Sequence, residues 1–158
     1  MHDLAIDAAH WRRLIGHWPT GVSVITSVGP RGCTANALTS LSLDPLLVLV
    51  CLDLGSNTLA AVRESHRFCI NVLASDQDEV ARRFATKAPA EEKFAEVGHT
   101  DQDGLPVLDG CLAWIACDAR DELPGGDHVI VTGAPVRAGL REDAVPLMSF
   151  RSEYRGLS

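Results

Sequence analysis

The pattern of apolar and polar positions is clearest between Cys33 and Leu52, where a polar strand of small residues runs into a buried apolar strand. Strand residues alternate between two faces, so the even positions from 34 to 42 share one face of the predicted strand. That face carries three hydroxyls, one amide and no charge: Thr34, Asn36, Leu38, Ser40 and Ser42. A strand facing bulk water usually carries Lys, Glu or Arg. Short neutral donors and acceptors therefore suit either a flat, polar, uncharged ring or ordered water at a sheet edge.

The same pattern predicts a mostly β fold with a few flanking helices. Strands are expected over 21–27, 33–43, 46–52, 67–73, 111–122, 127–140 and 147–150. Helices are expected over 7–18, 57–64 and 76–86, with a short helical turn at 90–94, and the rest of 87–104 is expected to be irregular. Regular β-α-β alternation is absent. This favours a Greek-key-like antiparallel barrel with helices covering its ends, in a single domain over 1–158.

Charge and cysteine usage narrow the partners and the compartment. The chain of 158 residues has a formal net charge of −7, which disfavours nucleic acid and anionic lipid as partners. Its five cysteines form no C-x-x-C pair and have no zinc-ligand spacing, so we expect reduced thiols and no metal site. The N-terminal segment has no basic-then-apolar signal, and no apolar run reaches membrane-spanning length. A cytoplasmic location is expected.

The common catalytic and phosphate-binding motifs are missing from the sequence. No G-x-G-x-x-G follows a strand, and there is no P-loop, no G-x-S-x-G and no H-E-x-x-H. The six histidines are scattered singly. Spacing does not exclude a hydrolytic Ser/His/Asp set, but nothing indicates one.

Two features give candidate sites for an anion and for a polar ring. The segment Gly55-Ser56-Asn57-Thr58 precedes a predicted helix, whose free N–H groups favour an anion, and the hydroxyls of Ser56 and Thr58 add donors. The alternative is an ordinary helix N-cap. Asn71 is an amide inside an apolar strand, where it needs hydrogen-bond partners. It is either a structural residue or a ligand contact.

Two further features lie towards the C-terminus. The turn Gly125-Gly126-Asp127-His128 presents His128 at a strand end, where it can donate a hydrogen bond or handle a proton. The alternative is a hairpin with an exposed histidine. Tyr154, the only tyrosine, is either a ring-stacking lid or an anchoring aromatic, and its position favours the anchor.

Together these residues resemble the short-chain flavin reductase family, the FMN-binding split-barrel reductases that supply reduced flavin to two-component monooxygenases. The matching segments follow one another along nearly the whole chain: residues 19–26 (PTGVSVIT), 34–52, 68–73 (FCINVL), 81–85 (ARRFA), 126–128 (GDH), and Phe150-Arg151 with Tyr154. Leu38 stands where the family commonly has an aromatic, which leaves the packing of the ring edge and the preference between FMN and FAD open.

The resemblance implies a split β-barrel homodimer with the flavin near the dimer interface. The residues placed against the isoalloxazine and ribityl chain are Thr34, Asn36, Ala37, Leu38, Thr39 and Ser40. Ser56 and Thr58 are expected near the phosphate, with Arg83 and Lys87 as its charge partners. Asn71 is expected to brace the pocket and Tyr154 to lie at it, and His128 is the expected nicotinamide contact and catalytic residue.

The implied activity is an NAD(P)H-dependent flavin reductase that transfers a hydride from NADH or NADPH to FMN or FAD and supplies a partner monooxygenase. The alternative is a non-catalytic flavin-binding split-barrel protein, a carrier or a sensor. The intact Gly-Asp-His turn favours the enzyme, because a carrier has no use for a nicotinamide-docking residue. A third possibility is a relative on the same barrel that handles haem or pyridoxamine phosphate.

Overall fold

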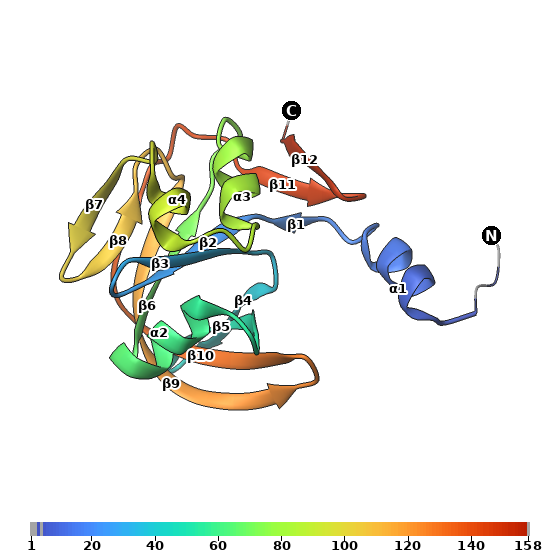
Figure 1. Ribbon diagram of the computed structural model, residues 1–158, viewed down its shortest axis with the longest axis horizontal. Coiled ribbons are helices and arrows are strands. Elements are labelled where there is room, and N and C mark those ends of the chain that lie inside the picture. Colours follow the sequence, from blue (N-terminus) through green and yellow to red (C-terminus); the bar gives the residue numbers. More distant parts are fainter. Residues whose placement is uncertain (1–2, 4, 158) are drawn as a thin grey trace.

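A computed structural model describes residues 3 and 5–157 (Figure 1). Its helices are α1 (Ala8–Ile15), α2 (Asn57–Ser65), α3 (Asp78–Phe84) and α4 (Ala90–Phe94). Its strands are β1 (Thr20–Gly21), β2 (Ser23–Ser27), β3 (Arg31–Ala35), β4 (Leu38–Leu43), β5 (Leu46–Asp53), β6 (Arg67–Val72), β7 (His99–Gln102), β8 (Leu105–Leu108), β9 (Ala113–Gly125), β10 (His128–Leu140), β11 (Leu147–Phe150) and β12 (Glu153–Gly156). The prediction of a mostly β fold with few helices is confirmed.

The main sheet has seven antiparallel strands in the order β3-β2-β6-β9-β10-β5-β4. Its two edge strands, β3 and β4, are consecutive in the chain and are joined by Asn36 and Ala37 alone. The sheet must therefore curl so that its opposite edges approach each other. Two smaller sheets, β1-β11-β12 and β7-β8, flank it.

The polar strand expected over 33–43 is in fact two strands, which is a correction to the predicted single polar face. β3 pairs with β2, whereas β4 pairs with β5 at the opposite edge. A register shift between Ser40 and Ser42 interrupts the alternation again. Because the chain bends at Asn36 and Ala37 to connect the two edges, the even positions do not share one face.

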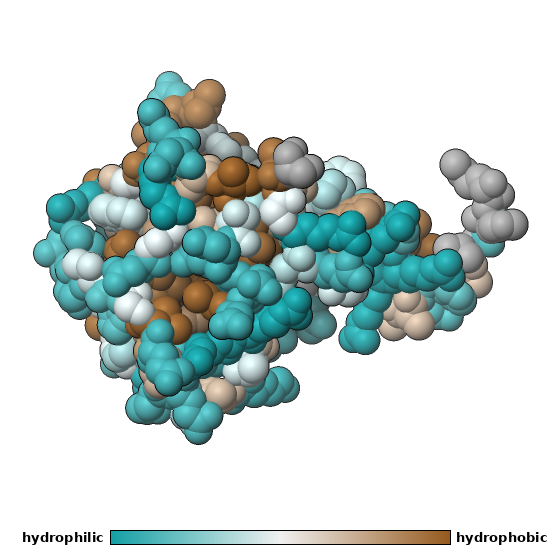
Figure 2. All heavy atoms as spheres, turned by 90° about the horizontal axis from the view of Figure 1, so that it is seen from above, coloured by the Kyte–Doolittle hydropathy of each residue, from teal (hydrophilic) through white to brown (hydrophobic). Residues whose placement is uncertain are grey.

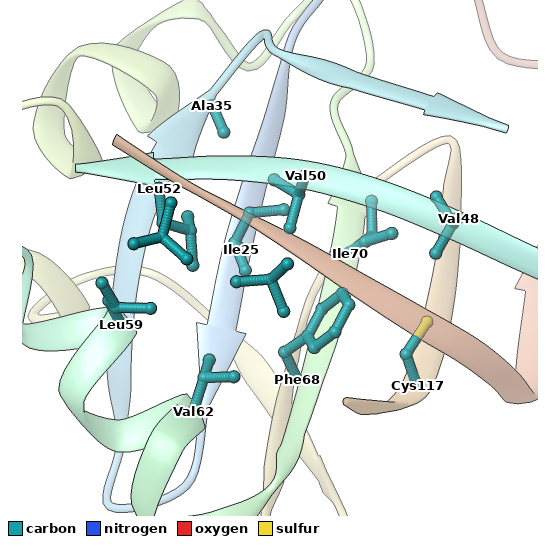
Figure 3. Close-up of a cluster of buried hydrophobic side chains, with 12 residues drawn as sticks. Ile25, Ala35, Val48, Val50, Leu52, Leu59, Val62, Phe68, Ile70 and Cys117 are labelled. Carbon is teal, nitrogen blue, oxygen red and sulfur yellow. The ribbon is translucent and has the colours of Figure 1, made fainter. Parts of the chain in front are cut away.

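The largest apolar cluster lies between the curled sheet and α2 (Figure 3). Ile25, Phe68 and Ile70 come from β2 and β6, and Leu59 comes from α2; all four side chains are fully buried. Each contributes about 1.5–3 kcal/mol by leaving water. A second cluster packs α3 and α4 against the other side of β2 and β3. β3 is therefore held between two packed layers while its outer edge remains free.

The hairpin β7-β8 lies in and just after the segment expected to be irregular. Its turn uses Asp103 and Gly104 at positive φ. Leu105 and the short apolar run after it are buried against β6. The strands have only four residues each, which is too short for a periodic signal.

The helix α1 extends away from the rest of the described chain and buries none of its residues (Figure 1). Seen from above, it forms a separate lobe at the right of the molecule (Figure 2). Among the described residues, no helix has the length and apolar character needed to cross a membrane.

Candidate functional site

A cavity of about 530 Å³ opens at the free edge of β3. Its walls are the N-terminus of α2 on one side and the segment from α3 to α4 on the other, and it extends to the end of β5 and the head of β10. The lining residues are 31–37, 51–53, 55–58, 84–88, Ala90, Lys93 and His128. This volume is within the range of small-molecule and cofactor sites.

The edge of β3 presents backbone donors and acceptors to the cavity. The amine of Lys93 donates a hydrogen bond of 3.3 Å to the carbonyl oxygen of Gly32, so this carbonyl points away from β2. In an antiparallel pair, residues two apart direct their N–H and C=O groups to the same side. The N–H and C=O of Thr34 therefore also face the cavity. They can pair with the polar edge of an uncharged ring.

The N-terminus of α2 is capped by its own side chain. The hydroxyl oxygen of Ser56 accepts hydrogen bonds from the N–H groups of Thr58 at 3.1 Å and Leu59 at 3.4 Å. The N-cap alternative is therefore confirmed. The Ser56 hydroxyl keeps its own proton as a donor, which points to the sulfur of Cys33 at 3.9 Å. Ser56 and Thr58 both line the cavity, Ser56 half-buried and Thr58 buried.

Cys33 is the sulfur-bearing residue of this wall. Burial raises the pKa of its thiol, against the opposing effect of the Thr58 and Ser56 hydroxyls. The thiol is therefore neutral at physiological pH and acts as a small apolar surface. All five cysteines are free in the structure.

The cavity is rich in cations although the protein as a whole is acidic. Arg31, Lys87 and Lys93 line it, with Asp53 as the only lining carboxylate among the described residues. The sequence contains two lysines, and both are here. Burial lowers the pKa of the Lys93 amine. The sequence interpretation named Lys87 but missed Lys93, although the clustering of both lysines within 87–93 was a visible signal.

His128 also lines the cavity, at the first position of β10 and opposite Asp53 of β5. The preceding residues form a tight turn in which Gly126 has a φ of 72°, a conformation that glycine adopts without strain. Nδ1 of His128 lies 2.7 Å from Oδ1 of Asp127. The hydrogen bond to His128 lowers the pKa of the Asp127 carboxyl.

Asn36 and Ala37 line the cavity as predicted, and Thr34 lines it as well. The hydroxyl of Thr34, however, donates to the carbonyl of Ala81 at 2.6 Å, so its side chain is already engaged. Leu38 packs against the core and lines a second, smaller cavity of about 240 Å³ that also contacts Asn36.

Thr39 and Ser40 are exposed on β4 and lie outside the main cavity. The resemblance had placed both residues against the same ligand as Thr34. The break between β3 and β4 moves them to the opposite edge of the sheet.

Asn71 is a structural residue, which is one of the two alternatives that the sequence left open, and it does not line the cavity. Its side chain is fully buried and makes three hydrogen bonds within the protein. Its amide nitrogen donates to the carbonyl of Val24 and to the hydroxyl of Thr26, both at 3.1 Å, and its oxygen accepts from the N–H of Leu108 at 2.8 Å. Asn71 thus joins β6 to β2 and β8.

Arg83 and Tyr154 also lie outside the cavity. The guanidinium of Arg83 donates to the carbonyls of Glu92 and Ala95, so it fastens α3 to α4 and is not a phosphate partner in this arrangement. Tyr154 packs against the second apolar cluster beneath the guanidinium of Arg82. It is an anchoring aromatic.

The fold and the cavity together define a class: an antiparallel β protein whose edge strand can pair with a polar ring, in a cavity that also contains cations and a histidine. Among the described residues there is no group of three or more side chains that could hold a metal ion. The family described as "Flavin reductase like domain" matches residues 15–158. The chain belongs to this family.

Curated relatives and solved structures agree. The chain is 38% identical over 159 residues to the reductase subunit HsaB of a flavin-dependent monooxygenase from Mycobacterium tuberculosis, covering 96% of this chain and 83% of the relative. It is 32% identical over 161 residues to an NADH-dependent flavin reductase from Rhodococcus, covering 98% and 89%. An NADH:FAD oxidoreductase from Streptomyces globisporus, solved in complex with NAD and FAD fragments, has a TM-score of 0.94 at 31% identity and covers 99% of this chain and 98% of its own.

Proposed function

We propose that the cavity beside β3 binds the flavin and that His128 contacts the nicotinamide cofactor that reduces it. The observation that carries this proposal is that one cavity contains the outward-facing backbone of Thr34, the cation of Lys93 and the imidazole of His128. A flavin nucleotide needs these three environments: a neutral polar edge, an anion site and a place for its reductant.

The residues of the cavity fit such a ligand. The isoalloxazine ring would lie along Thr34, Asn36 and Ala37, where no charged or bulky side chain intervenes. Its phosphate would lie between Lys93 and the hydroxyls of Ser56 and Thr58. This replaces the predicted pairing with Arg83, whose donors are used within the protein.

When bound, the flavin (FMN or FAD) would accept a hydride from the reduced nicotinamide of NADH or NADPH. The protein holds the two rings in contact and needs no strong acid or base of its own. His128 orients the nicotinamide. Its neighbour Asp127 can only accept from Nδ1, so a neutral imidazole offers Nε2 as an acceptor to the cavity.

We further propose that the reduced flavin serves a partner monooxygenase. The HsaB relative supports this proposal because it is named a reductase subunit of a flavin-dependent monooxygenase. The relatives named for NADH support NADH as the reductant. A cytoplasmic location remains a prediction from the sequence.

A homodimer is also proposed, with α1 as part of the interface. This helix and the residues after it expose large apolar side chains: Trp11, Leu14, Ile15 and Trp18, between 46% and 71% exposed. A surface of this kind marks an interaction site. Light scattering coupled to size exclusion should give twice the chain mass, and Leu14→Glu should shift the mass towards the monomer.

The activity is tested by following NADH and NADPH oxidation with FMN, FAD and riboflavin as acceptors. Turnover with at least one pair is expected, and Lys93→Met should raise the KM for FMN by about tenfold while changing that for riboflavin by less than about twofold, since a hydrogen bond to a charged group is lost. Arg120→Ala, an exposed cation outside the cavity, is the matched control. Flavin binding with no turnover by either nicotinamide would instead support the carrier or sensor.

A further inference from the structure

The three cations of the cavity are held in different ways. Lys93 reaches inward and is half-buried, with its amine on the carbonyls of Gly32 at 3.3 Å and Phe84 at 3.4 Å. Lys87 is exposed on the segment between α3 and α4, and Arg31 is half-buried at the first position of β3. Lys93 is therefore bonded to the edge of β3, whereas Arg31 lies at the start of that strand and Lys87 on the connecting segment. Arg31 and Lys87 are called the rim pair below.

Arg31 is held at the rim by the turn that precedes it. One guanidinium nitrogen, Nη1, donates to the carbonyls of Gly29 and Pro30. The remaining N–H donors of the guanidinium have no recorded partner among the described residues. Arg31 and Cys33 are two residues apart on the same side of β3, a step of roughly 6.5 Å along the strand. Arg31 therefore lies one such step beyond Cys33, which contacts Ser56.

The cavity lining is positively charged, whereas the protein as a whole is negatively charged. The chain has 21 acidic and 14 basic residues, yet the cavity lining has three cations and one carboxylate. Within the described part of the chain, none of Arg31, Lys87 and Lys93 has a carboxylate within 4.0 Å. Unpaired cations around a concave site attract an anion. The flavin phosphate proposed above pairs with only one of these cations, Lys93.

We propose that Arg31 and Lys87 form a second anionic subsite, which binds the outer phosphate of a flavin dinucleotide and makes FAD the preferred flavin. This inference rests on the proposed function. Lys93 with the Ser56 and Thr58 hydroxyls holds the phosphate next to the ribityl chain, which FMN and FAD share. The rim then holds the adenylate phosphate, which FMN lacks.

The test compares the KM for FAD and for FMN in the purified full-length protein, with NADH as the reductant. Exposed charge pairs are individually weak, so both cations are removed together. The double variant Arg31→Ala/Lys87→Ala should raise the KM for FAD by about tenfold. It should raise the KM for FMN by less than about threefold, because FMN lacks the outer phosphate. The conservative pair Arg31→Lys/Lys87→Arg should restore most of the FAD preference. In the wild type, added salt should weaken the binding of FAD more than the binding of FMN. Arg120→Ala should change neither the KM for FAD nor the KM for FMN.

A second arm identifies which dinucleotide uses the rim. Reduced nicotinamide mononucleotide lacks the outer phosphate of NADH. In the opposing outcome, the double variant raises the KM for NADH but not for the mononucleotide, while the ratio of the KM values for FAD and FMN stays unchanged. That result would mean that the rim binds the reductant, and it would overturn the flavin assignment. Equal KM values for FAD and FMN in the wild type would also overturn it while leaving the reductase activity intact. Absence of any flavin reduction would instead refute the proposed function itself.

Discussion

Nδ1 of His128 lies 2.7 Å from the carboxylate of Asp127, and the two residues occupy the turn that leads into β10. The contact fixes which nitrogen carries the proton of a neutral imidazole, because the carboxylate accepts and cannot donate. It leaves Nε2 free for the nicotinamide contact that we propose. The lowered pKa of Asp127 keeps this carboxylate ionised below the usual titration range of aspartate.

The first prediction concerns His128. His128→Ala should lower the rate of hydride transfer by at least about tenfold, since a positioning contact to the nicotinamide is lost. The affinity for flavin should change by less than about twofold, because the proposed flavin contacts lie along β3 and at α2. Stopped-flow absorbance measures the first quantity and fluorescence titration the second. Equal losses of hydride transfer rate and flavin affinity would show instead that His128 contacts the flavin or stabilises the fold.

A matched control is available on α2. His66 is an exposed histidine at the C-cap with a φ of 56°. Asparagine tolerates this conformation, so His66→Asn should leave both the hydride transfer rate and the flavin affinity unchanged.

The second prediction separates a structural amide from a site amide. Asn71→Ala should lower the free energy of unfolding by about 3 kcal/mol, because it leaves the buried N–H of Leu108 without an acceptor and removes the two hydrogen bonds that the amide donates to the Val24 carbonyl and the Thr26 hydroxyl. Asn36→Ala, an exposed position that lines the cavity, should change stability little and weaken flavin binding. Urea denaturation and flavin titration give the two quantities for each variant. The reverse pattern would restore Asn71 to the site.

Much of the fold could be predicted from the sequence because periodicity is strong where strands are long and buried. The apolar run of β5 and the capping residue before α2 predicted these elements nearly to their ends, and α3 was predicted to within two residues of each end. The division of the polar strand could not be predicted in this way. A strand that bends at Asn36 and Ala37 to join two sheet edges has the same local sequence pattern as a straight one, and only the pairing partners distinguish them.

The site divides in the same manner. Asn36, Ala37, Ser56, Thr58 and His128 line the cavity as the resemblance implied. Arg83 does not, because a cation in the last turn of α3 can reach either the cavity or the carbonyls at the end of α4, and the sequence carries no information on that choice. Lys93 is the counterpart: it projects from α4 onto an edge carbonyl that no sequence pattern reveals.

The third prediction concerns the packing that places Lys93. A Cβ at Gly32 would lie 2.7 Å and 2.9 Å from two ring carbons of Phe84. Gly32→Ala should therefore push α3 away from β3, lowering stability by about 1–3 kcal/mol and weakening flavin binding through the displaced wall of the cavity. Phe84→Leu in the same chain should recover part of both losses. Urea denaturation with flavin titration measures the recovery, and strictly additive losses would show that the two residues do not interact.

The fourth prediction concerns the alkaline limb of stability. Burial raises the pKa of Cys69 and of Cys117 to about 12, from an ordinary value of 9.0. Above pH 9 the unfolded chain therefore loses thiol protons that the folded chain keeps, so the unfolded state binds fewer protons and the free energy of unfolding falls as pH rises towards the folded value. At about pH 10 the loss should be about 1 kcal/mol for each thiol. Urea denaturation in reductant across this range should show the fall, and Cys69→Ala/Cys117→Ala should flatten it. Ile70→Val, which destabilises the same core without removing a thiol, should keep the slope. A double variant with the wild-type slope would show that other groups govern the alkaline limb.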